Sequence, residues 1–405
     1  MNALGRILLA FLVALTSLSA ISQRAREQGV TDTEIRIGNI MPYTGNLKAF
    51  EAIGKAEAAY FDMINERGGI NGRKVRFISY DDNSDPSIAL DLTRGLVERD
   101  NVLLMFGSFG TPGNLAVRKY LNDRQIPQLF VASGDDVWSN PAAYPWTMGW
   151  RPSFRTEGRI YANYIQAFYP GSKIVVLWQN DQFGRDVFKG LQEGLGDLAR
   201  MIIVDIAHDL SDQYLDTHVS ILKRSGAEIF IFAGVPANAA QVIRIAADLN
   251  WHPVLILNDT AASIATALKP AGLDNAAGVI STAFFKDASD PRWKDDPAIK
   301  DWLSFREKYY RGGQDDNGAL FGYAAAETMA QVLKQCGDDL SRENVMRQAA
   351  ALTDYEGSIL LPGITISTGA SDFAPIKQLR LVQFDGRTWQ PIGDVVDSVS
   401  SGARK

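Results

Sequence analysis

The sequence predicts an α/β protein of two doubly wound, Rossmann-like lobes, each with a mostly parallel sheet between layers of helices. Three observations support this prediction. Short apolar runs alternate with segments of helical periodicity along most of the chain. The alternation comes in two arrays of similar size, separated by a break rich in Trp, Pro and Asn at residues 138–152. The chain of 405 residues is also long enough for two ordinary domains.

The first array alternates expected strands with expected helices. Residues 34–40 alternate apolar and polar side chains, as a half-buried strand does. Apolar residues then recur at helical spacing from Phe50 to Ile64, and Gly68 with Gly69 supplies the stop. Further strands are expected at residues 74–80, 102–106 and 128–131.

The second array begins after the break and is followed by a less regular part. Its strands are expected at residues 173–178, 201–206, 228–232 and 253–257, each before a helical pattern. A strand at residues 278–285 then precedes helices expected at 302–310, 320–334 and 342–351. The tail at residues 363–396 returns to strands, with an Asp385-Gly386 turn.

Composition and charge exclude several classes of function. The formal net charge is −6, and clustered Lys and Arg are lacking, which argues against nucleic acid as a partner. The sequence has only three histidines, which argues against a His-based metal site and against a histidine as catalytic base. The single cysteine, Cys336, excludes an internal disulfide and a Cys-rich zinc site. We therefore expect no metal and no cofactor.

The N-terminus has the layout of a secretory signal peptide at residues 1–20. One basic residue, Arg6, precedes an apolar core from Ile7 to about Leu15, and small residues follow. The alternative is a membrane anchor, but the apolar run is short for a span. Since no cysteine lies near the expected cleavage region, lipid attachment there is excluded. We expect an exported protein, located in the periplasm.

A glycine-rich loop at residues 107–113 follows one expected strand and opens one expected helix. Three interpretations compete. A nucleotide site would need G-x-G-x-x-G or a lysine, whereas the loop reads G-x-x-G-x-x-G and has no lysine. A tight turn that only brings the helix close to its strand is the second. Capture of a small carboxylate by the N–H groups of the helix start is the third.

Six segments, in order along the chain, resemble the type I periplasmic solute-binding proteins of the branched-chain (hydrophobic) amino acid ABC transporter family. They are residues 29–38, 42–45, 64–73, 81–86, 179–184 and 361–364. The resemblance implies two lobes joined by three crossing strands, expected near residues 148–151, 281–285 and 355–363. Lobe I would then comprise residues 30–150 and 282–354, and lobe II residues 151–281 and 355–405.

The resemblance favours the third interpretation of the glycine-rich loop, because the family holds the α-carboxylate of its ligand at this helix start. The implied donors on the first turn are Ser108, Gly110 and Thr111, beside Phe109. The next turn would complete the carboxylate site with Ala132, Ser133, Gly134 and Asp135. Asp135 would repel a carboxylate, so it either caps the following helix or meets an amine or hydroxyl of the ligand.

On the amine side the sequence departs from the family, which uses two tyrosines and a glutamate of lobe II for the ammonium. The matching positions are Phe183, Val235 and Asp259, so two of the three partners are altered. An ammonium there would be poorly solvated. We therefore expect a small carboxylate-bearing ligand, either an amino acid or, in view of these altered positions, an acid with an apolar or aromatic body and no amine. Tyr43, Phe50, Phe109 and Phe183 are expected to line its pocket. Ordinary core packing is the alternative for each, and it is the favoured interpretation for Phe50.

The implied function is capture of a small molecule by cleft closure, followed by delivery to an ABC permease with separate ATPase subunits. The chain itself would catalyse no reaction, and the family expectation is a monomer. Two alternatives remain. One is a ligand-sensing module of the same fold, and the other is an exported α/β enzyme, for which the sequence displays no evident base.

Overall fold

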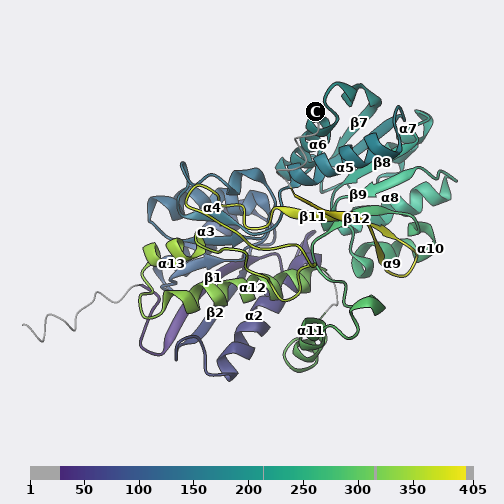
Figure 1. The fold of residues 1–405 in the computed structure, drawn as a ribbon. Helices are drawn as coiled ribbons and strands as arrows, with labels where there is room; N and C mark the ends of the chain where they lie inside the picture. The colour runs from purple at the N-terminus through teal and green to yellow at the C-terminus, as the bar shows by residue number, and fades with distance from the viewer. Residues whose placement is uncertain (1–27, 213, 314–316, 398–405) are drawn as a thin grey trace, which may run out of the picture.

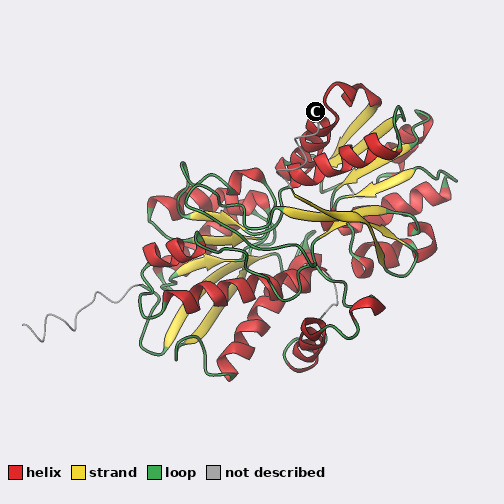
Figure 2. Cartoon of the chain, in the orientation of Figure 1, coloured by secondary structure: helices red, strands yellow, loops and turns green. Residues whose placement is uncertain are grey.

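The computed structural model describes residues 28–212, 214–313 and 317–397, which form two α/β lobes lying end to end (Figure 1). Helices cover both faces of each sheet, and the predicted fold class is confirmed (Figure 2). The predicted signal peptide at residues 1–20 lies outside the described residues. None of the described helices combines the length and the apolar character needed to span a lipid bilayer.

Lobe I contains a five-stranded parallel sheet in the order β2-β1-β3-β4-β5. Its strands are β1 (Glu34–Met41), β2 (Lys74–Asp81), β3 (Leu104–Phe106), β4 (Gln128–Val131) and β5 (Thr147–Gly149). Its helices are α2 (Glu51–Glu66), α3 (Pro86–Glu98), α4 (Thr111–Asp123), α11 (Pro297–Lys308), α12 (Asn317–Cys336) and α13 (Arg342–Ala349), with short turns η1 (Lys48–Phe50), η2 (Asp136–Trp138) and η6 (Pro291–Trp293). The late helix α12 packs along α2.

Local sequence explains where the helices of lobe I begin and end. Asp85 is the N-cap of α3. Its side chain accepts hydrogen bonds from the N–H groups of Ser87 and Ile88, which have no partner within the helix. Helix α2 ends at Glu66, and the N–H of Gly69 bonds to the carbonyl of Ile64 at 2.9 Å. Gly69 has a φ of +78°, which glycine adopts at low cost.

Lobe II contains a seven-stranded sheet in the order β12-β11-β10-β9-β8-β6-β7. Strands β6 to β10 run parallel. The tail strand β11 pairs antiparallel with β10, and β12 pairs antiparallel with β11. The strands are β6 (Ile174–Gln179), β7 (Ile202–His208), β8 (Ile229–Ala233), β9 (Val254–Leu257), β10 (Ile280–Ala283), β11 (Gln378–Phe384) and β12 (Trp389–Asp397). The helices are α5 (Phe154–Phe168), α6 (Gln182–Leu195), α7 (Asp216–Arg224), α8 (Pro236–Asp248), α9 (Lys269–Ala271) and α10 (Leu273–Ala276), with short turns η3 (Gly196–Met201), η4 (Asp259–Ala261) and η5 (Ile264–Leu268).

Two of the segments between the lobes pair with each other. After β10 the chain forms an antiparallel bridge between Phe285 and Leu360, and the N–H of Leu361 bonds to the carbonyl of Phe284 at 2.9 Å. The segment after β5 packs on this pair through Trp150. Its indole lies 6.1 Å from the ring of Phe285, centroid to centroid, and its N–H donates to Thr328 on α12.

The predicted division into lobes at residues 151, 282 and 355 stays a prediction. The residue 282 boundary falls inside β10, which belongs to the sheet of lobe II. After residue 355 the chain first bonds to lobe I, because Thr368 donates to the carbonyl of Ala349 at 2.7 Å and accepts from the N–H of Leu352 at 3.0 Å. It enters the sheet of lobe II at β11.

Candidate ligand-binding cleft

A cleft of about 1190 Å³, counting its open part, lies where the two lobes meet along the crossing segments. Both lobes contribute to its walls, and so does the first crossing segment. The lining residues used below are Phe50, Phe109, Ala132, Arg151, Asp259 and Phe284. Ligand sites in α/β sheets lie outside the carboxyl ends of parallel strands, and the turns after β3, β4 and β9 all reach this cleft.

The first predicted turn joins β3 to α4 and has the geometry of a helix start that faces open space. Gly110 is the residue before α4 and has a φ of +86°. A Cβ added to Gly110 would meet nothing within 4 Å. The N–H groups of the first helical turn have no partner within the helix, and Pro112 removes one of them. The N–H of Thr111 and that of Gly113 remain as donors for an anion.

The second predicted turn lies beside the first, as expected from the resemblance. Phe109 and Ala132 form a parallel bridge, and the N–H of Ala132 bonds to the carbonyl of Ser108 at 3.0 Å. The hydroxyls of Thr111 and Ser133 are hydrogen-bonded to each other at 2.7 Å. The structure therefore brings the predicted residues of the two turns together, although only Phe109 and Ala132 of this set line the cleft.

Two residues of these turns have structural roles within the protein. The hydroxyl of Ser108 accepts from the N–H of Ile40 at 3.2 Å, which fixes the turn to the end of β1. The carbonyl of Gly134 accepts from the N–H of Phe154 at 2.8 Å. A Cβ on Gly134 would lie 2.4 Å from the carbonyl oxygen of Pro152, so the close approach of the first crossing segment requires glycine there.

Asp135 is the N-cap of η2, the first of the two roles expected for it. Its Oδ1 accepts from the N–H of Val137 at 3.0 Å, and its buried Oδ2 has no hydrogen-bond partner among the described residues. Burial raises the pKa of Asp135 to about 7, and the negative charge of Asp186 adds to this rise. At neutral pH the carboxyl of Asp135 is therefore partly protonated.

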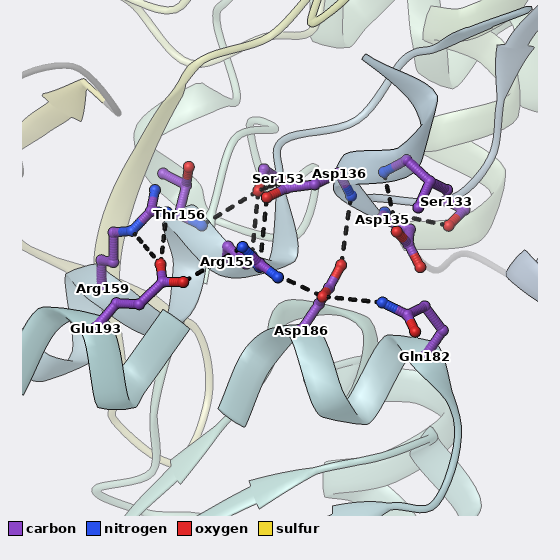
Figure 3. Close-up of polar contacts among 11 residues, drawn as sticks. Ser133, Asp135, Asp136, Ser153, Arg155, Thr156, Arg159, Gln182, Asp186 and Glu193 are labelled. Carbon is purple, nitrogen blue, oxygen red and sulfur yellow. Dashed lines mark hydrogen bonds and ion pairs between the residues drawn. The ribbon is translucent and has the colours of Figure 1, made fainter. Parts of the chain in front are cut away.

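Asp135 belongs to a polar network that joins the lobes (Figure 3). The N–H of Asp136 donates to Asp186 on α6 at 3.4 Å, and the hydroxyl of Ser153 donates to Asp136. Arg155 on α5 lies within ion-pair distance of Asp136 at 3.5 Å and of Asp186 at 3.4 Å. Since Arg155 lies within ion-pair distance of two of these three carboxyl groups and not of Asp135, protonation of Asp135 relieves repulsion.

Substitution of Asp135 by asparagine is expected to make the protein about 2 kcal/mol more stable at pH 8 and no more stable at pH 4. A raised acid pKa means that the folded state holds its proton, so the stability from this group is present below the ordinary pKa and is lost as pH rises through about 7. Asparagine keeps the cap and cannot ionise. Urea unfolding midpoints at the two pH values measure the effect. Equal pH profiles for both proteins would contradict this prediction.

Phe183 and Val235, two of the predicted amine-side positions, do not line the cleft. Phe183 is buried in lobe II, with its ring edge-on to Phe154 at 4.7 Å between centroids. Val235 is buried at the start of α8, and the next residue, Pro236, reaches the cleft instead. For Phe183 the alternative of core packing therefore describes its place better. Asp259, the third position, does line the cleft.

The residue that sequence reasoning missed is Arg151, which forms an ion pair with Asp259 through Nη2 and Oδ2. Both side chains are nearly buried, with 10% and 9% of their surface exposed. The guanidinium carbon lies 5.2 Å from the ring centre of Phe154 and 5.9 Å from that of Phe284. A signal was present in the sequence, since Arg151 ends the predicted first crossing directly after the apolar Trp150.

Glu157 on α5 lies behind Asp259 and is fully buried. Its Oε1 accepts from the N–H of Asp259 at 2.6 Å, from Tyr161 at 2.6 Å and from Thr282 at 2.9 Å. Burial, together with the negative charge of Asp259, raises the pKa of Glu157 to about 8. Glu157 is therefore mainly neutral at pH 7, while it holds the backbone of Asp259 in place.

Tyr43 lies at the partly buried end of a polar chain of lobe I and is not among the residues that line the cleft. Its hydroxyl bonds to Ser79 at 2.7 Å, Ser79 donates to Asn39 at 2.7 Å, and Asn39 donates to Glu57 at 3.2 Å. Burial raises the pKa of Tyr43 to about 12 and that of Glu57 well above its usual range. Gly107 covers this chain with a φ of +65°, and a Cβ there would lie 2.0 Å from Glu57.

The remaining cleft wall is largely aromatic. Phe50 stacks on Phe109 with ring centroids 4.1 Å apart, so a residue assigned to the core from the sequence also lines the cleft. Phe284 and Phe285 of the second crossing segment and Phe321 of α12 continue this wall. Among the described residues, no group of three or more His, Cys, Asp or Glu side chains is arranged to hold a metal ion. The cleft suits an organic ligand with an apolar body.

Comparisons with known proteins agree with this architecture. A family model described as periplasmic binding protein matches residues 34–388. A Leu/Ile/Val-binding protein homolog 1 of Brucella abortus is 24% identical over 318 residues, which cover 76% of this chain and 81% of that protein.

Two solved structures show the same fold. One is a branched-chain amino acid ABC transporter protein from Thermus thermophilus with bound valine, with a TM-score of 0.83 at 17% identity over 92% of this chain and 98% of that one. The other is an ABC transporter solute-binding protein from Rhodopseudomonas palustris in complex with 3,4-dihydroxybenzoic acid. Its TM-score is 0.76 at 16% identity, over 90% of this chain and 98% of that one.

Proposed function

The chain belongs to the periplasmic binding protein family, and we propose that it is the extracytoplasmic ligand-binding subunit of an ABC importer for a small carboxylate-bearing ligand with an apolar or aromatic body. The ligand closes the two lobes around itself because it contacts both. The closed protein then delivers it to a permease, whose ATPase subunits supply the energy. The protein itself is not an enzyme.

The observation that carries this proposal is the pair of adjoining turns at the edge of the cleft. The first turn of α4 offers backbone N–H groups and the positive end of a helix dipole. The hydrogen-bonded hydroxyls of Thr111 and Ser133 lie beside it. The stacked rings of Phe50 and Phe109 provide an apolar surface next to these donors. A carboxylate at the turns would place the body of the ligand against the aromatic wall.

The relatives leave two ligand classes open, since one solved neighbour binds valine and another binds 3,4-dihydroxybenzoic acid. The chemistry of this cleft favours the class without an amine. The tyrosine positions of the family hold Phe183 and Val235, neither of which lines the cleft. An ammonium would therefore lack most of its partners.

Isothermal titration calorimetry with a panel of aryl carboxylates and aliphatic amino acids tests the proposal. We expect saturable heats for aryl or alkyl carboxylates. The Thr111→Val and Ser133→Ala double variant should bind them at least about tenfold more weakly. Thr93→Val, a buried and nearly isosteric change on α3 outside the cleft, serves as the control and should bind as the wild type does.

Tight leucine binding with no response to any aryl carboxylate would contradict the proposed ligand class. Turnover of a bound carboxylate, followed by mass spectrometry, would instead favour the alternative of an exported enzyme. Genome neighbourhood separates transport from sensing, because permease and ATPase genes beside this one favour transport. The sensing module remains the second candidate only on grounds of shared fold.

A further inference from the structure

We propose that Arg151 is an internal cation that occupies the place where the ammonium of an amino acid would bind, so that the cleft selects carboxylic acids without an amine. This inference rests on the proposed function, since it names the ligand class of the same cleft. It assigns the selection to one residue of the first crossing segment.

The surroundings of Arg151 are those of a site for an organic cation. Such sites combine a carboxylate with aromatic faces, because the ring quadrupole attracts a positive charge. Here Asp259 supplies the carboxylate, and Phe154 and Phe284 supply rings 5.2 Å and 5.9 Å from the guanidinium carbon. The cation inside this arrangement belongs to the protein, and both members of the ion pair line the cleft.

Neighbouring hydrogen bonds hold both members of the ion pair in place. The N–H of Asp259 donates to Glu157 at 2.6 Å, and the hydroxyl of Thr260 donates to Oδ1 of Asp259 at 3.1 Å. Arg151 directly follows Trp150, whose buried indole donates to Thr328 at 3.2 Å. Because both side chains are nearly buried, the pair is a part of the cleft wall rather than a loose surface contact.

Charge balance then excludes a second cation. Glu157 is mainly neutral at pH 7, because burial raises its pKa to about 8. The charge of Asp259 is already matched by that of Arg151. A ligand ammonium at Asp259 would either lie against the guanidinium or leave it unpaired, and breaking a nearly buried ion pair is strongly unfavourable. A ligand that lacks the amine neither contacts the guanidinium with a like charge nor breaks its ion pair.

Matched ligand pairs test this inference, because each pair differs only in the amine. Leucine is compared with isocaproate, and phenylalanine with hydrocinnamate, by calorimetry at pH 7. Wild-type protein should bind the amine-free member of a pair at least about tenfold more tightly. Arg151→Met leaves Asp259 free to receive an ammonium, so the affinity ratio should shift toward the amino acid by at least about tenfold.

Two further variants control the comparison. The double variant Arg151→Met, Asp259→Asn removes both charges. Its ratio of affinities should again favour the amine-free acid over the amino acid. Arg159→Met breaks an ion pair with Glu193 on the outer surface of α5 and α6, and its ratio should equal that of the wild type. A folded Arg151→Met protein with an unchanged ratio would overturn the inference. So would wild-type protein that binds leucine more tightly than isocaproate, although the proposed binding function would stand.

If wild-type protein binds no member of either pair and no aryl carboxylate, the proposed function fails and the inference falls with it. Should Arg151→Met not fold, Asp259→Asn decides the question. That variant keeps the internal cation, so it should keep its preference for the amine-free acid. A loss of leucine affinity of about tenfold in Asp259→Asn would mean that Asp259 binds the ligand ammonium, and it would overturn the inference.

Discussion

Replacement of Gly190 by alanine is expected to lower the free energy of unfolding by about 3 kcal/mol, because α5 and α6 touch at positions without side chains. A Cβ on Gly190 would lie 2.2 Å from the carbonyl oxygen of Arg155. Gly158 on the facing helix is equally close to the carbonyl oxygen of Val187. Since the obstructing atoms are backbone, no rotamer change relieves the clash and the helices must separate.

Separation of these helices should also weaken ligand binding. Helix α5 carries Glu157, which holds Asp259 at the cleft, and α6 carries Asp186 of the network between the lobes. Urea unfolding and calorimetry of the same variant measure both effects. Gly95→Ala on α3 is the control, because its Cβ would meet only the flexible end of Arg99 at 3.3 Å. It should be neutral or stabilise by up to about 1 kcal/mol. Equal midpoints for Gly190→Ala and wild type would contradict the prediction.

Much of the fold could be predicted from the sequence because the signals were local and repeated. Strands β3 and β4 are short apolar runs, and α2 shows helical spacing that ends at Gly68 and Gly69. The β11–β12 hairpin follows from the local Asp385-Gly386 turn, but the pairing of β11 with β10 joins segments far apart in sequence, so no local pattern reveals it. The same holds for residues 364–376, which return to lobe I before the chain enters β11.

The candidate site could be predicted only in part, for a related reason. The turns at Gly110 and Ser133 follow consecutive strands of one sheet, so their adjacency follows from the fold class. The ion pair of Arg151 and Asp259 joins residues 108 positions apart, from a crossing segment and from lobe II. The place of Arg151 at the end of the predicted first crossing indicates that it lies near the cleft, but it does not identify Asp259 as its partner. The prediction that Phe183 lies on the amine side depends on the family resemblance alone. In the structure its ring packs edge-on against that of Phe154 in the interior of lobe II.

Wild-type protein is expected to lose about 4 kcal/mol of its free energy of unfolding as pH rises, and substitution of Glu157 by glutamine should abolish this loss. Burial and the charge of Asp259 raise the pKa of Glu157 to about 8, from an ordinary value of 4.5. The folded state therefore holds a proton that the unfolded state has released. The resulting stability is fully present below pH 4.5 and is lost as pH rises through 8. Glutamine cannot ionise, and its carbonyl can accept the same three hydrogen bonds.

Urea unfolding from pH 5 to pH 9 measures this effect. Wild type and Glu157→Gln should have similar stability at pH 5 and diverge as pH rises. Glu157→Ala is the matched control, because it removes the acceptor for Tyr161, Thr282 and the N–H of Asp259. That variant should be less stable than wild type at every pH. Parallel profiles for wild type and Glu157→Gln would show that Glu157 does not titrate in this range.

The titration of Glu157 also sets the charge of the cleft. The charged groups that face it are Asp259 on η4 and Arg151 on the first crossing segment, and the neutral hydroxyl of Tyr161 on its own helix donates to it. While Glu157 is protonated, the positive charge of Arg151 and the negative charge of Asp259 cancel. When Glu157 ionises, the cluster gains one negative charge that no guanidinium matches. The discrimination against amines that we assign to Arg151 should therefore narrow above pH 8 in wild type, and Glu157→Gln should retain it.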